Sequence, residues 1–439
     1  MEDNILVVTM IVFAILLFLL ASGVYIAFAL LLTGLLVLWI FTPELVRSAA
    51  FHLFNSVNDF VLVAVPLFIF MGNIILHSGL TEKLYRGVTK ITEVLPGGLV
   101  HTNIAACSIF AAITGSATAT CVTIGTIAIP EQLARGYNRK IIMGSLLSGG
   151  TLGVLIPPSI IMIIYGAFVK VSVARLFLGG FLPGFLLAGM FMLLTAVATS
   201  FWWKSWVPPR RKLTWGYVPR AFSSITDIWP FMLMIVLILG SIYTGQATPT
   251  EAAALSGFIA LGMAALFRKL NFTSVRTATL EALRTTCFVA ICIVGGRLLG
   301  VAMSMIKLPA LLISLVTGLG FDPVVVWIII IAAYLILGML MEDVSLMIVT
   351  LPVTFPLMTQ LGFDPVWFGV QLTILIQLAM ITPPVGVVLY VMQGISKETP
   401  IQHIIQGSLP YVGVMVVSIA IFTAFPQIIL WLPNMMFGG

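Results

Sequence analysis

Two pairs of adjacent prolines, Pro157-Pro158 and Pro383-Pro384, interrupt long apolar segments of the chain. Proline has no backbone N–H, so each pair leaves two carbonyl groups, four residues earlier, without their helical partners. The carbonyls affected are those of Gly153, Val154, Ala379 and Met380. Such carbonyls at the end of a half-helix are ligands for sodium in membrane proteins, and half-helix N-termini attract anionic groups. The proline pairs therefore favour binding of a small hard cation beside an anion.

Short polar tracts near these positions offer further oxygen ligands. Ser159 and Thr382 flank the proline pairs, and the tracts 115–120 (GSATAT) and 342–345 (EDVS) interrupt two other apolar stretches. An ionised side chain in a membrane segment is costly and usually functional, which favours a cation or a hydrogen-bonded turn as the partner of Asp343. A simple kink, repaired by neighbouring helices, is the alternative for each proline pair.

We expect two sodium sites and one anion site, with sodium as the only metal ion and no other cofactor. The first sodium site comprises Ala112, Ser116, Thr118, Gly153, Ile156, Pro157 and Ser159. The second comprises Gly338, Asp343, Ser345, Ala379, Thr382 and Val385. The candidate anion residues are Ser116, Arg297 and Thr382. Arginine presents a planar fork of donors that suits a carboxylate or sulfonate, although Arg297 could instead extend to the outer membrane interface.

The composition places this chemistry inside a lipid bilayer. Hydrophobic residues make up 60% of the 439 residues and charged residues 8%, against about 45–50% apolar and about 25% charged in soluble domains. The chain lacks the alternating pattern of a membrane barrel, so the spans are expected to be helices. Crossings are predicted at about 5–21, 23–41, 60–77, 141–169, 176–201, 226–245, 251–267, 278–300, 367–395 and 409–432.

The positions of Lys and Arg predict the orientation in the membrane. The loop 203–220 is rich in basic residues, which the positive-inside rule assigns to the cytoplasm. These residues are Lys204, Arg210, Arg211, Lys212 and Arg220. Counting crossings from this loop places both termini on the periplasmic side, with Lys170 and Arg175 as the main exception. The net charge of +6 thus reflects loops of a multi-pass protein, and no nucleic-acid partner is expected.

An internal repeat relates the two proline pairs at an offset of 226 residues, since 383 − 157 = 226. At the same offset Pro130 matches Pro356 and Gly136 matches Gly362. The matched loops differ in charge, because 135–140 is basic and 361–366 is not, which favours opposite faces of the membrane and hence inverted repeats. We expect the first repeat to span 1–225 and the second 226–439.

The expected fold is an all-α polytopic membrane protein with two re-entrant hairpins and two broken helices. The first repeat contains a hairpin at about 95–134 and a broken helix at 141–169. The second contains a hairpin at about 324–361 and a broken helix at 367–395. Re-entrant turns are tolerated only where they are buried in protein or line a watery cavity, so the two polar tips are expected to share a site in mid-membrane.

Other motifs carry structure rather than catalysis. The sequence Thr248-Pro-Thr-Glu251 predicts a helix-capping box, and 81–92 predicts a basic amphipathic helix along the inner surface. No zinc-protease motif, nucleophile elbow or P-loop occurs, which argues against an enzyme and an ATPase.

Several strings resemble the signature segments of the large membrane subunit of TRAP (tripartite ATP-independent periplasmic) transporters. They are VPLFIFMGNIILHSGL (65–80), FAAITGSATAT (110–120), GGTLGVLIPPSIIMIIYG (149–166), TPTEAAA (248–254), GFDPVWFGV (362–370) and TPPVGVVLYVMQGI (382–395). The chain departs from the family at Ala117, where a second serine is usual, and at Val387 or Val388, where asparagine is frequent.

The resemblance implies a sodium-driven elevator mechanism in the bacterial inner membrane. It also implies two partners, a small four-helix membrane subunit and a periplasmic binding protein that delivers a small organic anion. A self-sufficient sodium–dicarboxylate symporter of related fold is the alternative carrier. A channel would not need paired broken helices, and a membrane-embedded enzyme would need a clustered acid, base or metal set.

Overall fold

The computed structural model describes residues 2–46, 49–209, 217–339, 341–384 and 386–438, and every regular element in these ranges is a helix. Eight helical segments within them are long and apolar enough to cross a membrane. The predicted all-helical membrane fold is confirmed. Of the ten predicted crossings, those at α2 and α18 are shorter, with 16 residues each.

The elements of the first half are α1 (Glu2–Ala21), α2 (Ile26–Phe41), α3 (Pro43–Val46), α4 (Ala49–Val57), η1 (Phe60–Val63), α5 (Ala64–His77), α6 (Thr81–Thr92), α7 (Leu99–Thr114), α8 (Ala117–Ala134), α9 (Arg139–Leu155), α10 (Ile160–Val169), α11 (Val173–Phe201) and η2 (Lys204–Trp206). Those of the second half are α12 (Tyr217–Tyr243), α13 (Pro249–Leu266), α14 (Phe272–Met305), α15 (Leu308–Gly318), α16 (Pro323–Gly338), α17 (Asp343–Gln360), α18 (Pro365–Met380), α19 (Val387–Ile395), α20 (Ile401–Ala424) and α21 (Gln427–Phe437).

Both predicted helix breaks are present at the proline pairs. The first separates α9 from α10, and the second separates α18 from α19. The 226-residue offset also relates the helix starts, because α8 begins at Ala117 and α17 at Asp343, whereas α9 begins at Arg139 and α18 at Pro365. The same succession of helical hairpin and broken helix therefore occurs twice along the chain.

The two predicted hairpins are also present. In the first, α7 and α8 are joined at Gly115, whose φ of 60° is readily adopted only by residues without a Cβ. The second consists of α16 and α17, which pack on each other. Each hairpin contacts the broken helix that follows it, since α7 and α8 pack on α9, and α16 and α17 pack on α18.

The structure differs from the sequence expectations at three elements. The last predicted crossing, 409–432, is divided where α20 ends at Ala424 and α21 resumes at Gln427. The predicted crossing 278–300 belongs to a longer helix, α14. The segment 81–92 is helical as predicted, but it packs between α12 and α7 and has seven buried residues. The predicted capping box at Thr248 and Glu251 is confirmed.

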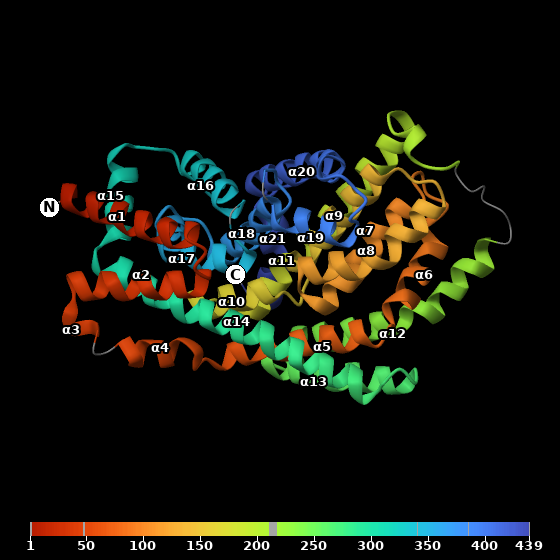
Figure 1. The fold of residues 1–439 in the computed structure, drawn as a ribbon, viewed down its shortest axis with the longest axis horizontal. Helices are drawn as coiled ribbons and strands as arrows, with labels where there is room; N and C mark the ends of the chain where they lie inside the picture. Colours follow the sequence, from red (N-terminus) through yellow and green to blue (C-terminus); the bar gives the residue numbers. More distant parts are fainter. Residues whose placement is uncertain (1, 47–48, 210–216, 340, 385, 439) are drawn as a thin grey trace.

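Helix α14 packs on α5 and also contacts α2 and α17. Figure 1 shows α5, α13 and α14 running together along one edge, with the broken helices in the middle of the molecule. Helix α9 lies between the first hairpin and α20, and it crosses α20 at Gly144 and Gly407, where a side chain on either glycine would meet the other backbone. Such close crossing requires glycine, and it makes this group of helices compact.

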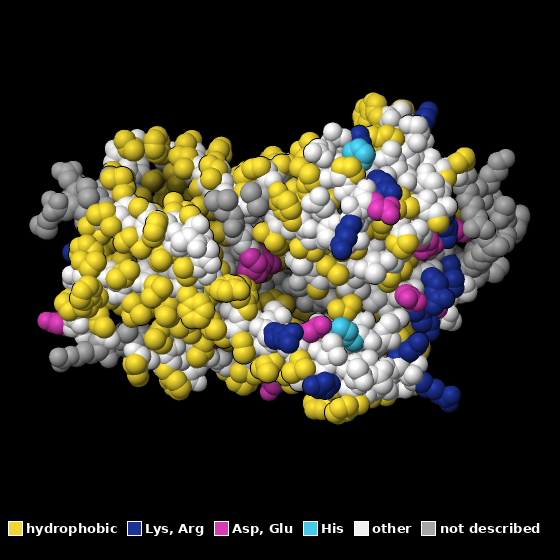
Figure 2. Space-filling model, in the orientation of Figure 1, with side chains coloured by type: hydrophobic (Ala, Val, Ile, Leu, Met, Phe, Trp, Pro, Cys, Tyr) yellow, Lys and Arg dark blue, Asp and Glu magenta, His cyan; other side chains and the backbone are white. Residues whose placement is uncertain are grey.

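Charge is unevenly distributed over the surface. Figure 2 shows Lys and Arg side chains gathered at the end of the visible face that carries α6, α8 and α12 in Figure 1, whereas the opposite end is largely hydrophobic. Of the basic loop at 203–220, Lys204 lies in η2, and Arg210, Arg211 and Lys212 lie outside the described residues.

Candidate ion and anion site

The end of the first hairpin lies directly against the first helix break. A Cβ on Gly115 would fall 2.9 Å from the Pro158 carbonyl oxygen, and a Cβ on Gly153 would fall 2.7 Å from the Ser116 carbonyl oxygen. Glycine at both positions thus allows two stretches of irregular backbone to touch. The Ser116 carbonyl also accepts from the Thr120 hydroxyl at 2.7 Å. Carbonyls of both elements thus face this contact, and that of Ser116 also accepts from the Thr120 N–H at 3.1 Å.

Hydroxyl groups at this break cap the adjoining half-helices. The side chain of Ser159 is fully buried and accepts from the Met162 N–H at 3.3 Å, so it caps α10. The Ser116 hydroxyl accepts from the Ala119 N–H at 3.4 Å and caps α8. Both N-termini therefore begin at the hairpin–break contact, and their positive ends favour an anion there.

The remaining residues of the first candidate sodium site surround this contact. Ile156 is the C-cap of α9, directly before Pro157. Ala112 is buried in α7, one turn before the hairpin end, and Thr118 is partly exposed in the first turn of α8. The structure thus gathers the predicted set around one hairpin end and one helix break.

At the second break, one carbonyl has a hydrogen-bond partner that the missing N–H groups of the prolines do not predict. Pro383 cannot donate to the Ala379 carbonyl, but the Thr382 N–H does so at 3.3 Å. The Thr382 hydroxyl donates to the Leu378 carbonyl at 2.6 Å. The Ala379 carbonyl is therefore partly satisfied, although a carbonyl retains a second lone pair for an ion. Gly338, at the end of α16, packs against Ala379, and Val385 lies outside the described residues.

The two acidic residues at the second hairpin have other roles than those expected from the sequence. Glu342 is the N-cap of α17, and its carboxylate accepts from the Ser345 N–H at 3.4 Å and from the Ser345 hydroxyl at 3.3 Å. Asp343 accepts from the next N–H, that of Val344, at 2.9 Å. The Ser345 hydroxyl also lies 3.7 Å from the Cys292 thiol of α14. The capping role considered for Asp343 belongs chiefly to Glu342.

Arg297 lies away from the hairpin ends. Its Nη2 donates to the Ala167 carbonyl near the end of α10 at 2.8 Å, and its guanidinium is 4.5 Å from the centre of the Phe168 ring. Its Nε is buried without a hydrogen-bond partner. The structure therefore does not bring Arg297 together with Ser116 and Thr382, which lie at the first hairpin end and the second helix break.

A second cation lies close to this arginine. Lys170 pairs with Asp59 at 2.6 Å. Burial alone would raise the pKa of Asp59, but hydrogen bonds from Lys170 and the Val61 N–H, with the charges of Lys170 and Arg297, bring it below its ordinary value. Asp59 is thus held ionised. Together, Asp59, Lys170 and Arg297 carry one net positive charge.

Two cavities lie at positions related by the 226-residue offset. The cavity beside Arg297 has a volume of about 510 Å³, and its counterpart has a volume of about 450 Å³. The first is lined by Phe168, Val169, Lys170, Leu351, Pro352, Phe355 and Pro356, with Arg297, Gly300, Val301, Ser304 and Met305 of α14. The second is lined by Gly394, Ile395, Ser396, Gly125, Thr126, Ile129 and Pro130, with Leu133, Arg139, Lys397 and Glu398. Adding or subtracting 226 converts the first seven residues of one set into those of the other.

One buried amide connects the two broken helices. In the orientation that satisfies both of its groups, Gln377 of α18 donates to the Thr151 carbonyl at 2.9 Å and accepts from the Leu155 N–H at 3.1 Å. Both partners belong to the last turns of α9, just before the first break. Gln377 therefore links α18 to α9 close to the first break.

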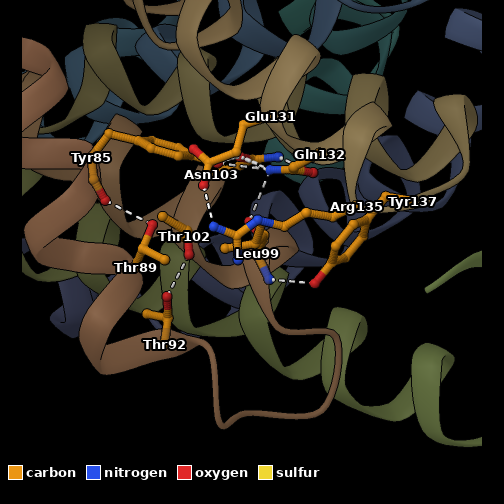
Figure 3. Close-up of polar contacts among 10 residues, drawn as sticks. All are labelled: Tyr85, Thr89, Thr92, Leu99, Thr102, Asn103, Glu131, Gln132, Arg135 and Tyr137. Atoms are coloured by element: carbon orange, nitrogen blue, oxygen red, sulfur yellow. Dashed lines mark hydrogen bonds and ion pairs between the residues drawn. The ribbon is translucent and has the colours of Figure 1, made fainter. Parts of the chain in front are cut away.

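A fully buried polar cluster at the base of the first hairpin was not predicted. Figure 3 shows the side chains of Tyr85, Asn103 and Gln132 pointing toward one another from α6, α7 and α8. Gln132 Nε2 donates to the Tyr85 hydroxyl at 2.9 Å, and Asn103 Nδ2 donates to the Ser145 hydroxyl of α9 at 2.8 Å. The only sequence signal is the presence of amides in apolar helices, and it does not reveal their partners. This cluster ties α6 to the first hairpin and to α9.

Comparison with known proteins identifies the family. Residues 13–428 match the family model described as the DctM component of the tripartite ATP-independent periplasmic transporter. This chain belongs to that family. It is therefore a TRAP transporter large permease, one component of a three-part transport system, and the resemblance in its signature strings is confirmed.

Two curated relatives illustrate the range of the TRAP large permeases. The chain is 30% identical to the C4-dicarboxylate TRAP transporter large permease DctM of Vibrio cholerae, over 95% of each chain. It is 31% identical to the isethionate TRAP transporter permease DctMQ of Oleidesulfovibrio alaskensis, over 85% of this chain and 58% of that protein.

A solved structure shares the fold. The YdaH transporter of Alcanivorax borkumensis superposes with a TM-score of 0.63 at 15% identity, covering 88% of this chain and 90% of that one. At that identity the comparison shows the architecture of the TRAP large permease and not its substrate.

Proposed function

We propose that this TRAP large permease imports a small organic anion, a carboxylate or sulfonate, by coupling it to sodium entry. The observation that carries the proposal is the matched pair of helix breaks, the first against the end of its hairpin and the second against Gly338. Carbonyls at half-helix ends suit a hard cation, and capped N-termini nearby suit an anion. We assign sodium to the two candidate sets and the anion to the space between them.

The substrate class rests on the relatives. One relative is named for a C4-dicarboxylate and the other for isethionate, a sulfonate. Both are small anions, in agreement with the N-terminal caps at Ser116 and Ser159. The family is tripartite, so we expect a small membrane subunit and a periplasmic binding protein to act with this chain.

We further propose that the two halves are inverted in the bacterial inner membrane and that the hairpins and broken helices move together as an elevator. The basic end seen in Figure 2 supports a cytoplasmic location for α6 and the α8–α9 turn. Both termini then lie on the periplasmic side. The two matched cavities have unequal surroundings, because only the first is lined by α14. This supports a motion of the hairpins and broken helices against the remaining helices.

The test is uptake of a radiolabelled C4-dicarboxylate and of isethionate into proteoliposomes that contain the permease and the small subunit, with the binding protein added outside. We expect uptake only with an inward sodium gradient. Equal uptake with potassium in place of sodium, at matched membrane potential, contradicts the coupling. Full uptake without the binding protein would instead support a self-sufficient symporter.

A further inference from the structure

One face of α8 is exposed along its length. Val122 is 37% exposed, and Thr126 and Pro130 are also exposed. Residues four apart lie on the same side of a helix, so the three form a continuous stripe. An exposed stripe within an otherwise buried hairpin is a surface that another element can cover.

The corresponding stripe of α17 is covered. Adding 226 converts Val122 to Ile348 and Thr126 to Pro352. Ile348 is fully buried against Gly296 of α14. A Cβ on Gly300, one turn further along α14, would fall 3.1 Å from Pro352 Cγ. Two small residues of α14 thus receive the α17 stripe.

Helix α5 stands before the first hairpin as α14 stands before the second. Gly72 of α5 faces that hairpin, because a Cβ on Gly72 would fall 3.1 Å from Thr114 Cα. Thr114 is the last residue of α7, so α5 contacts the hairpin at its end. Helix α14, by contrast, contacts the second hairpin along α17.

We infer that in a second state of the carrier the α8 stripe docks on α5, with Val122 against Gly72 and Thr126 beside Leu76. Here the glycines of α5 and α14 are aligned, so Gly72 and Leu76 take the places of Gly296 and Gly300 at an offset of 224 rather than 226. This inference rests on the proposed alternation between two states and names the surface that the alternation uses. In this second state the hairpin has slid past Gly72. Gly72 then contacts α8 at a point six residues beyond Ser116 and no longer contacts the hairpin end. At about 1.5 Å per residue this is a slide of about 9 Å.

The two cavities agree with this exchange. The cavity beside Arg297 is bounded on one side by α14, through Gly300 and Ser304. The matched cavity beside Thr126 and Pro130 is lined by α8, the start of α9 and the end of α19 with the segment after it. Docking of α8 on α5 would bound the second cavity on one side, as α14 now bounds the first.

The experiment uses two matched cysteine pairs in a chain whose native cysteines are replaced by alanine. Leu76→Cys with Thr126→Cys reports the second state. Gly300→Cys with Pro352→Cys reports the present one, because a Cβ on Gly300 would lie 3.4 Å from Pro352 Cβ, close to disulfide spacing. Each pair is oxidised in proteoliposomes containing the full complex, with and without a sodium gradient and anion. Leu76→Cys with Ile127→Cys is the control.

We expect both matched pairs to cross-link, each stopping uptake reversibly, and the control pair to cross-link at least tenfold more slowly. Formation of one cross-link should prevent the other. If Gly300–Pro352 cross-linking stops uptake but Leu76–Thr126 never forms, while the single variants transport, the docking surface is wrong and the proposed alternation stands. If uptake continues with the Gly300–Pro352 pair cross-linked, the alternation itself is wrong.

Discussion

Buried amides show how much a single residue can contribute to this fold. Gln132 Nε2 lies within hydrogen-bond distance of the Tyr85 hydroxyl at 2.9 Å, the Leu99 carbonyl at 3.2 Å and Asn103 Oδ1 at 2.5 Å, and it shares its two N–H groups among them. Gln132→Leu would remove these hydrogen bonds from the buried cluster, at about 0.5–1.5 kcal/mol each, while the Tyr85–Asn103 and Asn103–Ser145 bonds remain. We expect a clear fall in the melting temperature of the detergent-purified protein. Met358→Leu, at the matched position of the second half, replaces one buried apolar side chain with another and should change it little.

Arg297 provides a second test at this scale. Arg297 lies away from the two helix breaks, but its fork of donors and its position beside a cavity favour contact with the anion on its way to the space between them. Arg297→Lys retains the charge but loses the fork, so we expect KM for the anion to rise at least tenfold with unchanged sodium dependence. A structural arginine, bonded only to the Ala167 carbonyl, would change neither quantity. Ser304→Ala, on the same cavity wall, serves as the control.

Individual residues were predicted unevenly from the sequence. The proline pairs identify their breaks because a missing N–H acts on the same helix, four residues away. The choice between Glu342 and Asp343 as the cap of α17 depends on where the helix starts, which the sequence does not specify to one residue. The Tyr85 cluster depends on three helices meeting, and no local pattern contains that information.

At the scale of the helix, the two breaks can be tested by replacing the prolines that cause them. Pro383→Ala with Pro384→Ala restores two N–H donors, which would complete the helical bonds to Ala379 and Met380 and withdraw these carbonyls from an ion. We expect normal expression and loss of sodium-dependent uptake. The same should hold for Pro157 and Pro158. Pro410→Ala, inside the continuous helix α20, is the control. Either double variant with unchanged sodium affinity would rule out its site.

The pattern of apolar residues predicts some helix boundaries and not others. The hairpins were located within a few residues because Gly and polar tracts divide each apolar stretch. The break between α20 and α21 was missed because Phe425 and Pro426 lie in an apolar window, where one proline does not reveal which side the chain turns to. The packing of α6 against α12 was likewise hidden, because amphipathicity does not distinguish a membrane surface from a neighbouring helix.

For the whole molecule, the inversion of the two halves can be measured directly. Arg135 and Leu361 occupy matched loops, since 361 − 135 = 226, and both are at least partly exposed. In proteoliposomes of known orientation, we expect a membrane-impermeant maleimide to label Arg135→Cys from the cytoplasmic face and Leu361→Cys from the periplasmic face. The parent chain, with its four native cysteines, provides the background. Labelling of both from one side would show parallel rather than inverted units.

The bond between Gln377 and Thr151 has a consequence for the origin of the chain. These two positions are themselves 226 residues apart, so each touches its own counterpart. In a two-fold arrangement, only a residue beside the axis meets its own copy. If the two halves are inverted as proposed, their axis passes between α9 and α18 at this pair. The proposed inversion thus implies a half-length ancestor in which a single residue faced itself across a homodimer, with later divergence of its two copies into the amide Gln377 and the hydroxyl Thr151.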